Sequence, residues 1–376
     1  MKIAFYCPNK PLSHPHPSGD LVIAQGILKS LASQGHTCRE IVGFRSRWFW
    51  NRPTGWWRAI RAVFSAYKAC RGFRPEFWLT YHSYYKAPDV MGPWCSRILH
   101  IPYAIFQPMY GTRRRKTART KWGFVLNRRA IRSAHALFVN NLEDLEGVRR
   151  VADPFTVIYM PPGIFPEEFQ RDEALGMEVR HRLGIPSEMP LVMTACRFRP
   201  GVKFQSLAYC FESLGILKDN HERFMLMVVG DGPAHREVQN LAEGRLGERC
   251  VFAGAVPRQE MFHYYSAAHV FAFPGIGESL GMVYLEAQAC GVPVVALRTA
   301  GVPQVVRNGE TGFLVEDDGG RAMAMAVKRL LQDSALRNRM GAQGVEYVNR
   351  ERNLNQNYRD LSRKLEAIRL RFLQNA

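Results

Sequence analysis

The residues best suited to chemistry lie in the stretch PGIGESLGMVYLEAQACGVPVVAL, at positions 274–297. Its pattern predicts a strand that ends in a glycine-rich turn and then a helix. The first N–H groups of a helix have no partner within it and lie at the positive end of its dipole, so they can bind phosphate oxygens. We therefore expect an anion site at the backbone around Leu280, Gly281 and Met282.

Two glutamates accompany this turn. Glu278 precedes the predicted helix and Glu286 lies inside it, a separation of about 12 Å at about 1.5 Å per helical residue. That spacing suits a nucleotide sugar: one carboxylate can accept hydrogen bonds from sugar hydroxyls and the other from the ribose, with the diphosphate between them. The alternative is a pair of solvated surface glutamates, against which the glycines and the apolar strand VPVVAL argue.

Two cations follow an earlier strand. In ACRFRPGVKF, at 195–204, Arg197 and Lys203 are separated by a loop that contains Pro200 and Gly201. The loop can direct both cations at one diphosphate, where fixed positive charge stabilises a departing phosphate oxygen more in the transition state than in the ground state. The alternative is a solvated basic loop.

Two further glycine turns are expected at strand ends. They are VVGDGP at 228–233, which contains Gly230, and CVFAGAVP at 250–257. Doubly wound sheets bind ligands at the carboxyl ends of their strands, so this backbone could read a nucleotide base. Alternatively, these are ordinary tight turns.

The elements that must position these residues alternate regularly along the chain. Strand-like runs separated by helical stretches predict two doubly wound α/β domains, at 1–160 and 170–350, with a proline-rich hinge at 161–169. A long amphipathic helix should follow over 352–376, because apolar residues recur there at alternating four- and three-residue spacing. These residues are Leu354, Tyr358, Leu361, Leu365, Ile368 and Phe372.

In order and spacing, these segments resemble the retaining glycosyltransferases of family 4, which are well represented in bacteria and have the GT-B fold. The resemblance covers 190–345, including AGVPQVVRNGETGFLVEDD at 300–318, and extends to PSGDLVIAQGILKSLASQGHTC at 17–38. It implies two Rossmann-like domains that face each other across a cleft, with the C-terminal helix packed back toward the N-terminal domain. It also implies transfer from a nucleotide-diphosphate sugar, which is a co-substrate rather than a cofactor.

The resemblance assigns roles to the residues of the second domain, the nucleotide-sugar side. Arg197 and Lys203 would hold the donor diphosphate, Glu278 would contact the donor sugar and Glu286 would hold the ribose. The backbone of five residues would complete the phosphate site: Ser279, Leu280, Gly281, Met282 and Val283.

The first domain departs from the family's pattern. Gly19 would cap the cleft from that side, although the family often has two glycines where this chain has Ser18 and Gly19. Many members carry a histidine after the fourth strand, where IPYAIFQPMYG offers only Gln107. His82, in LTYHSYYKAPD, is the substitute that we assign to the catalytic site, although a lone histidine after a strand is often structural.

The distribution of acids bears on mechanism. An inverting transferase needs a general base on the acceptor side, whereas a retaining reaction can use the departing phosphate oxygen. The first domain is poor in carboxylates; Asp20 and Asp89 are its candidates near the cleft, and only Asp20 is attractive as a base. No Asp-x-Asp motif is present, so we expect a retaining, metal-independent reaction. An inverting transferase, a nucleotide-sugar epimerase and a phosphorylase remain alternatives on the same architecture.

The net charge of +18 lies entirely in residues 1–150, which hold 25 lysines and arginines against 7 acids, while the rest holds 26 of each. Tryptophans at 48, 50, 56, 57 and 122 lie among these arginines, in the segments 46–74 and 111–124. This composition predicts a surface that rests on an anionic membrane and admits a lipid-linked or glycan acceptor. The alternative is a set of solvated basic helices whose tryptophans are core.

Other classes of protein fit less well. A nucleic-acid-binding module would use the arginines and aromatic residues but would leave the glutamates and cations of the second domain unexplained, so we expect no nucleic-acid partner. No apolar run approaches the roughly 20 residues of a membrane span, and the beginning of the chain does not resemble a signal peptide. The eight cysteines lack zinc-site spacing. We expect a cytoplasmic protein, peripheral on the inner face of the membrane.

Overall fold

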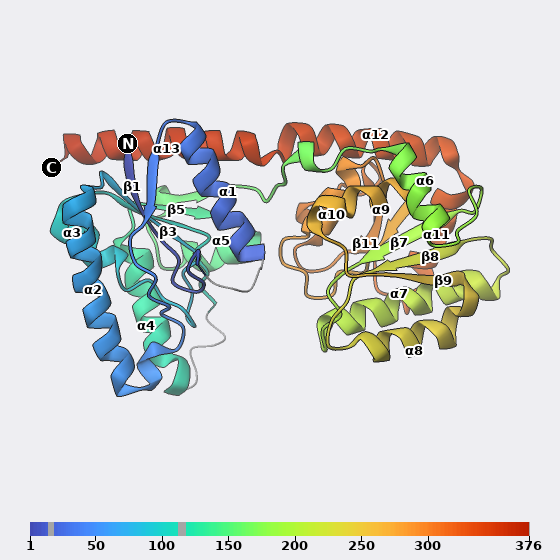
Figure 1. The fold of residues 1–376 in the computed structure, drawn as a ribbon, viewed down its shortest axis with the longest axis horizontal. Coiled ribbons are helices and arrows are strands. Elements are labelled where there is room, and N and C mark those ends of the chain that lie inside the picture. The colour runs from blue at the N-terminus through green and yellow to red at the C-terminus, as the bar shows by residue number, and fades with distance from the viewer. Residues whose placement is uncertain (14–18, 112–117, 376) are drawn as a thin grey trace. The chain divides into compact units, whose positions relative to one another are not determined.

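The computed structural model describes residues 1–13, 19–111 and 118–375. Its internal contacts divide the chain into two compact units: unit 1 comprises Met1–Pro161 and Asn355–Ala376, and unit 2 comprises Pro162–Leu354. Each unit contains a parallel sheet with helices packed on it (Figure 1). The domain limits and the hinge role of residues 161–169 stay predictions.

Unit 1 is built on a six-stranded parallel sheet in the order β2-β1-β3-β4-β5-β6. Its central strands are buried almost throughout, as expected when helices cover both faces of a parallel sheet. The strands are β1 (Lys2–Tyr6), β2 (Thr37–Glu40), β3 (Phe77–Tyr81), β4 (Tyr103–Phe106), β5 (Ala136–Val139) and β6 (Val157–Tyr159).

The helices of unit 1 alternate with its strands. They are α1 (Gly19–Ser33), α2 (Pro53–Phe73), α3 (Gly92–Leu99), α4 (Ala118–Ser133) and α5 (Leu142–Arg149). Helix α2 begins at a proline, which lacks an N–H at a position where the helix has no partner for one. Helix α3 contacts both α2 and α4.

Unit 2 contains a second six-stranded parallel sheet, in the order β12-β11-β10-β7-β8-β9. Alternate residues of β7 point into different cores: Met193 packs in one buried cluster and Val192 in the other. The strands are β7 (Leu191–Ala195), β8 (Met225–Val229), β9 (Cys250–Gly254), β10 (Val270–Ala272), β11 (Val294–Leu297) and β12 (Gly312–Val315). The helices are α6 (Glu173–Arg182), α7 (Val202–Asp219), α8 (His235–Leu246), α9 (Met261–Ala267), α10 (Met282–Ala289), α11 (Arg321–Gln332) and α12 (Ser334–Glu351).

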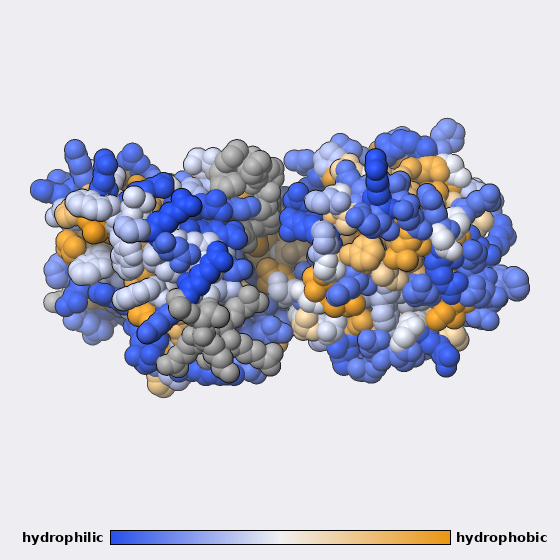
Figure 2. Space-filling model, turned by 90° about the horizontal axis from the view of Figure 1, so that it is seen from below, coloured by the Kyte–Doolittle hydropathy of each residue, from blue (hydrophilic) through white to orange (hydrophobic). Residues whose placement is uncertain are grey.

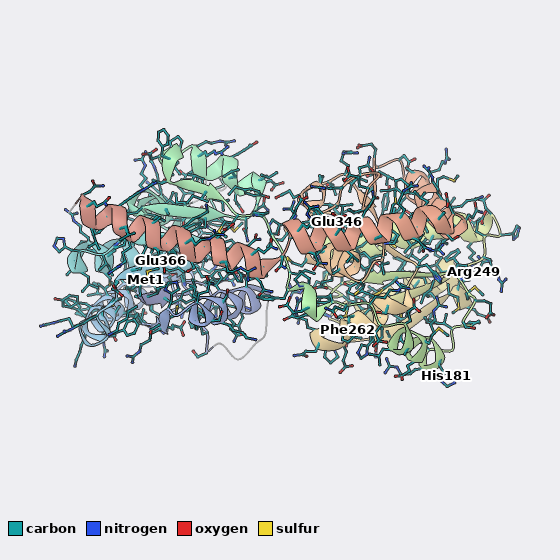
Figure 3. All side chains as sticks on the ribbon, turned by 90° about the horizontal axis from the view of Figure 1, so that it is seen from above. Met1, His181, Arg249, Phe262, Glu346 and Glu366 are labelled. Atoms are coloured by element: carbon teal, nitrogen blue, oxygen red, sulfur yellow. The ribbon has the colours of Figure 1, made fainter. Side chains whose placement is uncertain are left out.

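The last helix, α13 (Leu354–Gln374), packs on unit 1 as predicted. The ring of Tyr358 lies 6.5 Å from that of Phe106, and Ser362 Oγ lies 2.6 Å from His36 Nε2. His36 also contacts the Met1 amino group and lies 3.6 Å from Glu366, which Figure 3 labels together with Met1. The predicted return of the C-terminal helix to the N-terminal domain is therefore confirmed.

The sheets contain two strands that the apolar runs did not predict, β2 and β12. Both lie at a sheet edge, where a strand pairs on one side only. Strand β2, with the sequence TCRE, is nowhere fully buried. Short edge strands with polar or partly exposed side chains leave no long hydrophobic run in the sequence.

Candidate functional site

The glycine-rich turn after β10 has the backbone geometry that its sequence predicts. Gly275, Gly277 and Gly281 all have positive φ, at 78°, 67° and 65°. Gly281 directly precedes α10, and a Cβ there would approach Val305 Cγ2 to 2.7 Å. The N–H of Ile276 donates to Ser206 Oγ of α7 at 3.1 Å, so the turn is held against that helix. The turn is thus a fixed structure at the N-terminus of α10.

Lys203 and Glu278 form an ion pair at this turn, although 75 positions separate them in the sequence. The lysine side chain is 28% exposed and the glutamate side chain 18%, so solvent still reaches both. Lys203 Nζ also lies 5.1 Å from the centre of the Phe273 ring. The backbone N–H of Gly301 donates to the Glu278 carbonyl at 2.8 Å, which holds the glutamate from the other side. Two residues predicted separately are therefore brought together.

Arg197 lies exposed on the loop after β7. The backbone of this loop is bound to the end of β8, because the N–H of Phe198 donates to the Asp231 carbonyl at 3.0 Å. Gly230 has φ 138°, and a Cβ there would come within 1.9 Å of the Cys196 carbonyl oxygen. The structure thus gives Gly230 a packing reason; its role in nucleotide binding stays a prediction.

Glu286 is buried in α10, with 5% of its surface exposed, which excludes the solvated alternative for this residue. Its Oε1 accepts from Arg258 Nη1 at 2.6 Å and its Oε2 accepts from the Tyr265 hydroxyl at 3.0 Å. Burial raises the pKa of Glu286, while Arg258 and Tyr265 favour its ionised form. The guanidinium of Arg258 also lies 4.9 Å from the Phe169 ring centre. Sequence reasoning missed Arg258 and Tyr265; the only signal was that Arg258 follows the glycine turn after β9.

A second pair that sequence reasoning missed lies at the carboxyl end of β8. Asp231 Oδ1 lies 2.8 Å from His235 Nδ1 and accepts the N–H of Gly232 at 2.7 Å. Both contacts lower the pKa of Asp231, and the hydrogen bond from the N–H of Gly232 is the larger cause. The His235 ring lies between 5.9 and 6.3 Å from the rings of Phe198 and Phe252. An acid followed four positions later by a histidine at a helix start was the available signal.

In unit 1, His82 and Gln107 follow the neighbouring strands β3 and β4 at the same edge of the sheet. Both have left-handed backbones, with φ 60° and 58°, which is uncommon for residues with a side chain. His82 is 8% exposed, and its ring stacks on Tyr84 with the centres 4.8 Å apart. Gln107 Oε1 accepts from the Tyr81 hydroxyl at 3.2 Å. A contact of His82 with substrate stays a prediction.

Two acids of unit 1 are buried or partly buried. Asp89, a predicted candidate near the cleft, is buried and accepts from Thr80 and Tyr103 hydroxyls and from the N–H of Gly92, so it holds the start of α3. Asp144 is partly buried near His82. Burial raises its pKa to about 6, and His82 opposes that shift.

Two predicted features border on undescribed residues. Gly19 is the first residue of α1, and the preceding residues 14–18 lie outside the described part of the chain. The basic run Arg113, Arg114, Arg115 and Lys116 also lies outside it. The tryptophans of the two basic segments differ in exposure. Trp50 is buried, and its indole N–H donates to the Arg119 carbonyl, whereas Trp57 and Trp122 are 70% and 55% exposed. The prediction of an interfacial role was therefore wrong for Trp50.

Comparisons with known proteins give a matching family model and similar folds. Residues 190–333 match the family model described as glycosyl transferases group 1. A GDP-mannose-dependent alpha-(1-6)-phosphatidylinositol monomannoside mannosyltransferase of Mycolicibacterium smegmatis is 35% identical over 50% of this chain and 51% of its own length. The chain spans about half the length of the first curated relatives it matches.

Solved structures show the same fold across the whole chain. A sucrose-phosphate synthase from Thermosynechococcus elongatus matches with a TM-score of 0.73 and 20% identity, covering 98% of this chain and 99% of that one. Anabaena HepE in complex with UDP-glucose matches with a TM-score of 0.72 and 17% identity, covering 98% and 100%. With two parallel α/β sheets, a helix that returns to the first, and these similar structures, the chain has the GT-B fold, and its residues 190–333 match the group 1 glycosyl transferases.

Proposed function

We propose that the protein is a retaining, metal-independent glycosyltransferase that moves a sugar from a nucleotide-diphosphate donor to a lipid-linked or glycan acceptor. The observation that carries this proposal is the pairing of Lys203 with Glu278 at the N-terminus of α10. A cation, a carboxylate and helix N–H donors then lie at one turn, and each suits a different part of a nucleotide sugar.

A donor diphosphate would exchange with the ion pair. Its oxygens would take Lys203 as a partner and bind the N–H groups at the start of α10, with exposed Arg197 as a second cation. Glu278 would then be released from Lys203 and free to accept hydrogen bonds from hydroxyls of the sugar. The two cations would stabilise the charge on the leaving diphosphate, so the proposal needs no divalent ion.

The ribose would bind at Glu286. Because Arg258 favours the ionised carboxylate, Glu286 would act purely as a hydrogen-bond acceptor for ribose hydroxyls. Tyr265 fixes its second oxygen from behind. This arrangement suits a contact that forms on binding and persists unchanged through the reaction.

We propose a retaining reaction at these residues. The bond between the anomeric carbon and the diphosphate oxygen breaks, and the acceptor oxygen bonds to the same face of that carbon. The acceptor's proton passes to the departing phosphate oxygen, which serves as the base. His82 would contact the donor sugar or the acceptor from unit 1, in place of a histidine at Gln107.

The relatives support the class of substrates. The name of the mycobacterial relative describes a GDP-mannose donor and a phosphatidylinositol-based acceptor, and the Anabaena protein binds UDP-glucose. Both donors are nucleotide-diphosphate sugars. We propose a donor of this class and an acceptor with a lipid or glycan portion.

The surface of unit 1 supports a membrane partner. Residues 41–75 contain eight lysines and arginines and no Asp or Glu, and the aromatic side chains Trp57 and Phe64 of α2 are 70% and 69% exposed. Trp56 of α2 contacts Trp122 of α4, with ring centres 5.9 Å apart, so the two helices share this face. Figure 2 views the molecule from below and shows hydrophilic surface there interrupted by less polar groups. We propose peripheral binding of this face to the anionic cytoplasmic leaflet.

Over the residues that the structure covers, no helix combines the length and apolar character needed to cross a membrane.

A screen of UDP-, GDP-, ADP- and TDP-sugars in excess EDTA tests the enzymatic part. We expect slow hydrolysis of one nucleotide sugar, with full activity in EDTA and with the released sugar initially in the donor's anomeric configuration by NMR. An absolute need for magnesium or manganese would refute metal independence, and an inverted product would refute the retaining assignment. If no nucleotide sugar binds, the proposed function is wrong.

A further inference from the structure

A separate cavity lies in unit 1, between α3, α4 and the end of α13. Its volume is about 400 Å³, within the range of small-molecule sites. Four of its lining residues are arginines or histidines, and none of the lining residues that the structure describes is acidic. These four are Arg97, His100, Arg129 and His135. A pocket whose charged lining residues are all cations favours an anionic ligand.

The position of the cavity separates it from the reaction. His100 follows α3 just before β4, and His135 follows α4 just before β5, so both lie at the amino ends of the strands. His82 and Gln107 follow strands, at the opposite edge of the same sheet. A ligand in this cavity would therefore bind away from the carboxyl-end site.

Two of the lining side chains are held in defined positions. The guanidinium of Arg129 lies 4.9 Å from the centre of the Trp94 ring. His135 Nδ1 accepts the N–H of Tyr103 at 3.1 Å, so its Nε2 is the ring nitrogen that carries a hydrogen and can donate. The site thus combines arginines, which bind phosphate in a forked geometry, with a neutral imidazole donor.

The surroundings of the cavity indicate where its ligand comes from. Trp94 lines the cavity and is 48% exposed, and Ile98 of the same helix is 51% exposed. Helix α3 contacts both α2 and α4, the helices that carry the exposed Trp57 and Trp122. Exposed aromatic and aliphatic side chains beside a basic pocket suit a membrane interface.

We propose that this cavity binds the phosphate of an anionic phospholipid headgroup, with Arg97 and Arg129 as its charged partners. The inference rests on the membrane binding in the proposed function and goes beyond it, because it requires a phosphate group rather than negative charge alone. A phospholipid headgroup and a free compound such as glycerol 3-phosphate share this chemistry, because both are phosphate esters. Binding to each is measured separately.

The test compares two arginine pairs on vesicles of a neutral galactolipid that contain equal fractions of phosphatidylglycerol or of oleate, which is anionic without phosphate. Arg97→Gln with Arg129→Gln removes the pocket cations. Arg58→Gln with Arg61→Gln removes the same charge from exposed positions on α2. We expect the wild type to bind phosphatidylglycerol vesicles about tenfold more tightly than oleate vesicles, the scale of a charge-assisted contact to phosphate.

The variant that lacks the two pocket arginines should lose the preference for phosphatidylglycerol. The variant that lacks the two α2 arginines should bind both kinds of vesicle more weakly by the same factor and should keep the preference. Equal losses on both lipids for both pairs would overturn the phosphate site and leave general membrane binding intact. If free glycerol 3-phosphate binds by calorimetry and the wild type shows no lipid preference, the lipid source is wrong. If the wild type binds neither vesicle, both membrane statements fail, while donor hydrolysis still tests the enzymatic proposal separately.

Discussion

The two units share one architecture but hold their positive charges differently. In unit 2, the site cations contact carboxylates: Lys203 pairs with Glu278, and Arg258 pairs with Glu286. Away from the site the same holds, as with Arg245, which contacts two acids on α7. Each charge is thereby held at a definite position.

In unit 1, acids are few and several cations lie over aromatic rings, as Lys203 and Arg258 also do in unit 2. Arg119 lies 5.2 Å from the centre of the Trp48 ring and Arg129 lies 4.9 Å from that of Trp94. Charges held in place can act on a developing negative charge, whereas a surface rich in one sign of charge attracts a partner without fixing it. The comparison therefore supports the proposals that the donor residues lie in unit 2 and that the charge of unit 1 attracts a partner.

The largest effect should come from the two cations that we assign to the donor diphosphate. Lys203→Ala or Arg197→Ala should lower turnover of the donor by at least about a hundredfold, because each removes a contact that strengthens in the transition state. The matched control is Arg350→Ala, whose side chain is 75% exposed and paired within α12; it should retain wild-type turnover. Near-normal turnover in both site variants, with the fold intact, would remove the phosphate assignment.

A smaller effect should follow from the ribose contact. Glu286→Gln keeps the shape of the buried side chain and an acceptor for Tyr265, but it removes the charge that pairs with Arg258. We expect nucleotide binding, measured by calorimetry, to weaken about tenfold with little change in kcat, since this contact is similar in ground and transition states. Glu346→Gln, exposed on α12, is the control. Unchanged binding with a collapse of kcat would show that Glu286 acts on the sugar instead.

The donor side was largely predictable from the sequence because motif and topology coincide there. Lys203 and Glu278 follow β7 and β10, which are adjacent in the sheet, so turns after these strands must meet. Arg258 and Tyr265 were not predictable, because an arginine in a turn and a tyrosine in a helix are common residues in common places. Only packing shows that both reach Glu286.

The acceptor side was less predictable because composition does not tell which way a side chain points. The tryptophan-rich segment suggested one exposed face, but Trp50 is buried while Trp57 is exposed. Asp144 looked like an ordinary acid at a helix start, and its raised pKa comes from burial in the folded unit. Helix phase and burial are tertiary properties that this sequence leaves open.

Asp144 in unit 1 and His269 in unit 2 should contribute pH dependences of opposite sign to stability. Burial raises the pKa of Asp144 in unit 1 to about 6, above its unfolded value of about 3.9, so its stabilising effect is complete below about pH 4 and is lost as pH rises through 6. Burial lowers the pKa of His269 in unit 2 to about 4, below its unfolded value of about 6.5, so its effect is complete above about 6.5 and is lost as pH falls through 4.

Two variants test these contributions of Asp144 and His269 to stability. Asp144→Asn should stabilise unit 1 by on the order of 1 kcal/mol at pH 7 and by little at pH 4, once solvent screening is allowed for. His269→Asn should flatten the loss of stability of unit 2 between pH 6.5 and 4. All seven tryptophans lie in unit 1, so their fluorescence follows its unfolding, and hydrogen exchange of β7 follows unit 2. The same pH slope in variant and wild type would contradict either assignment.

The smallest effect concerns individual side chains of the attractive surface, because many groups share it. The intact protein should sediment with anionic vesicles at low ionic strength and be released as salt rises toward about 0.5 M, where screening shortens electrostatic attraction to a few ångströms.

Replacing both Trp57 and Trp122 by serine should weaken binding a few-fold at about 0.15 M salt, because it removes exposed aromatic area while leaving the net charge unchanged. Trp50→Phe is the matched control: it changes a buried indole, so vesicle binding should not respond. Donor hydrolysis should stay at the wild-type rate in both variants, since neither replaces a residue that we assign to the donor or to catalysis. If the wild type does not bind anionic vesicles at low salt, the positive charge of unit 1 does not serve membrane binding. Its basic face then binds a soluble anionic acceptor or has no partner.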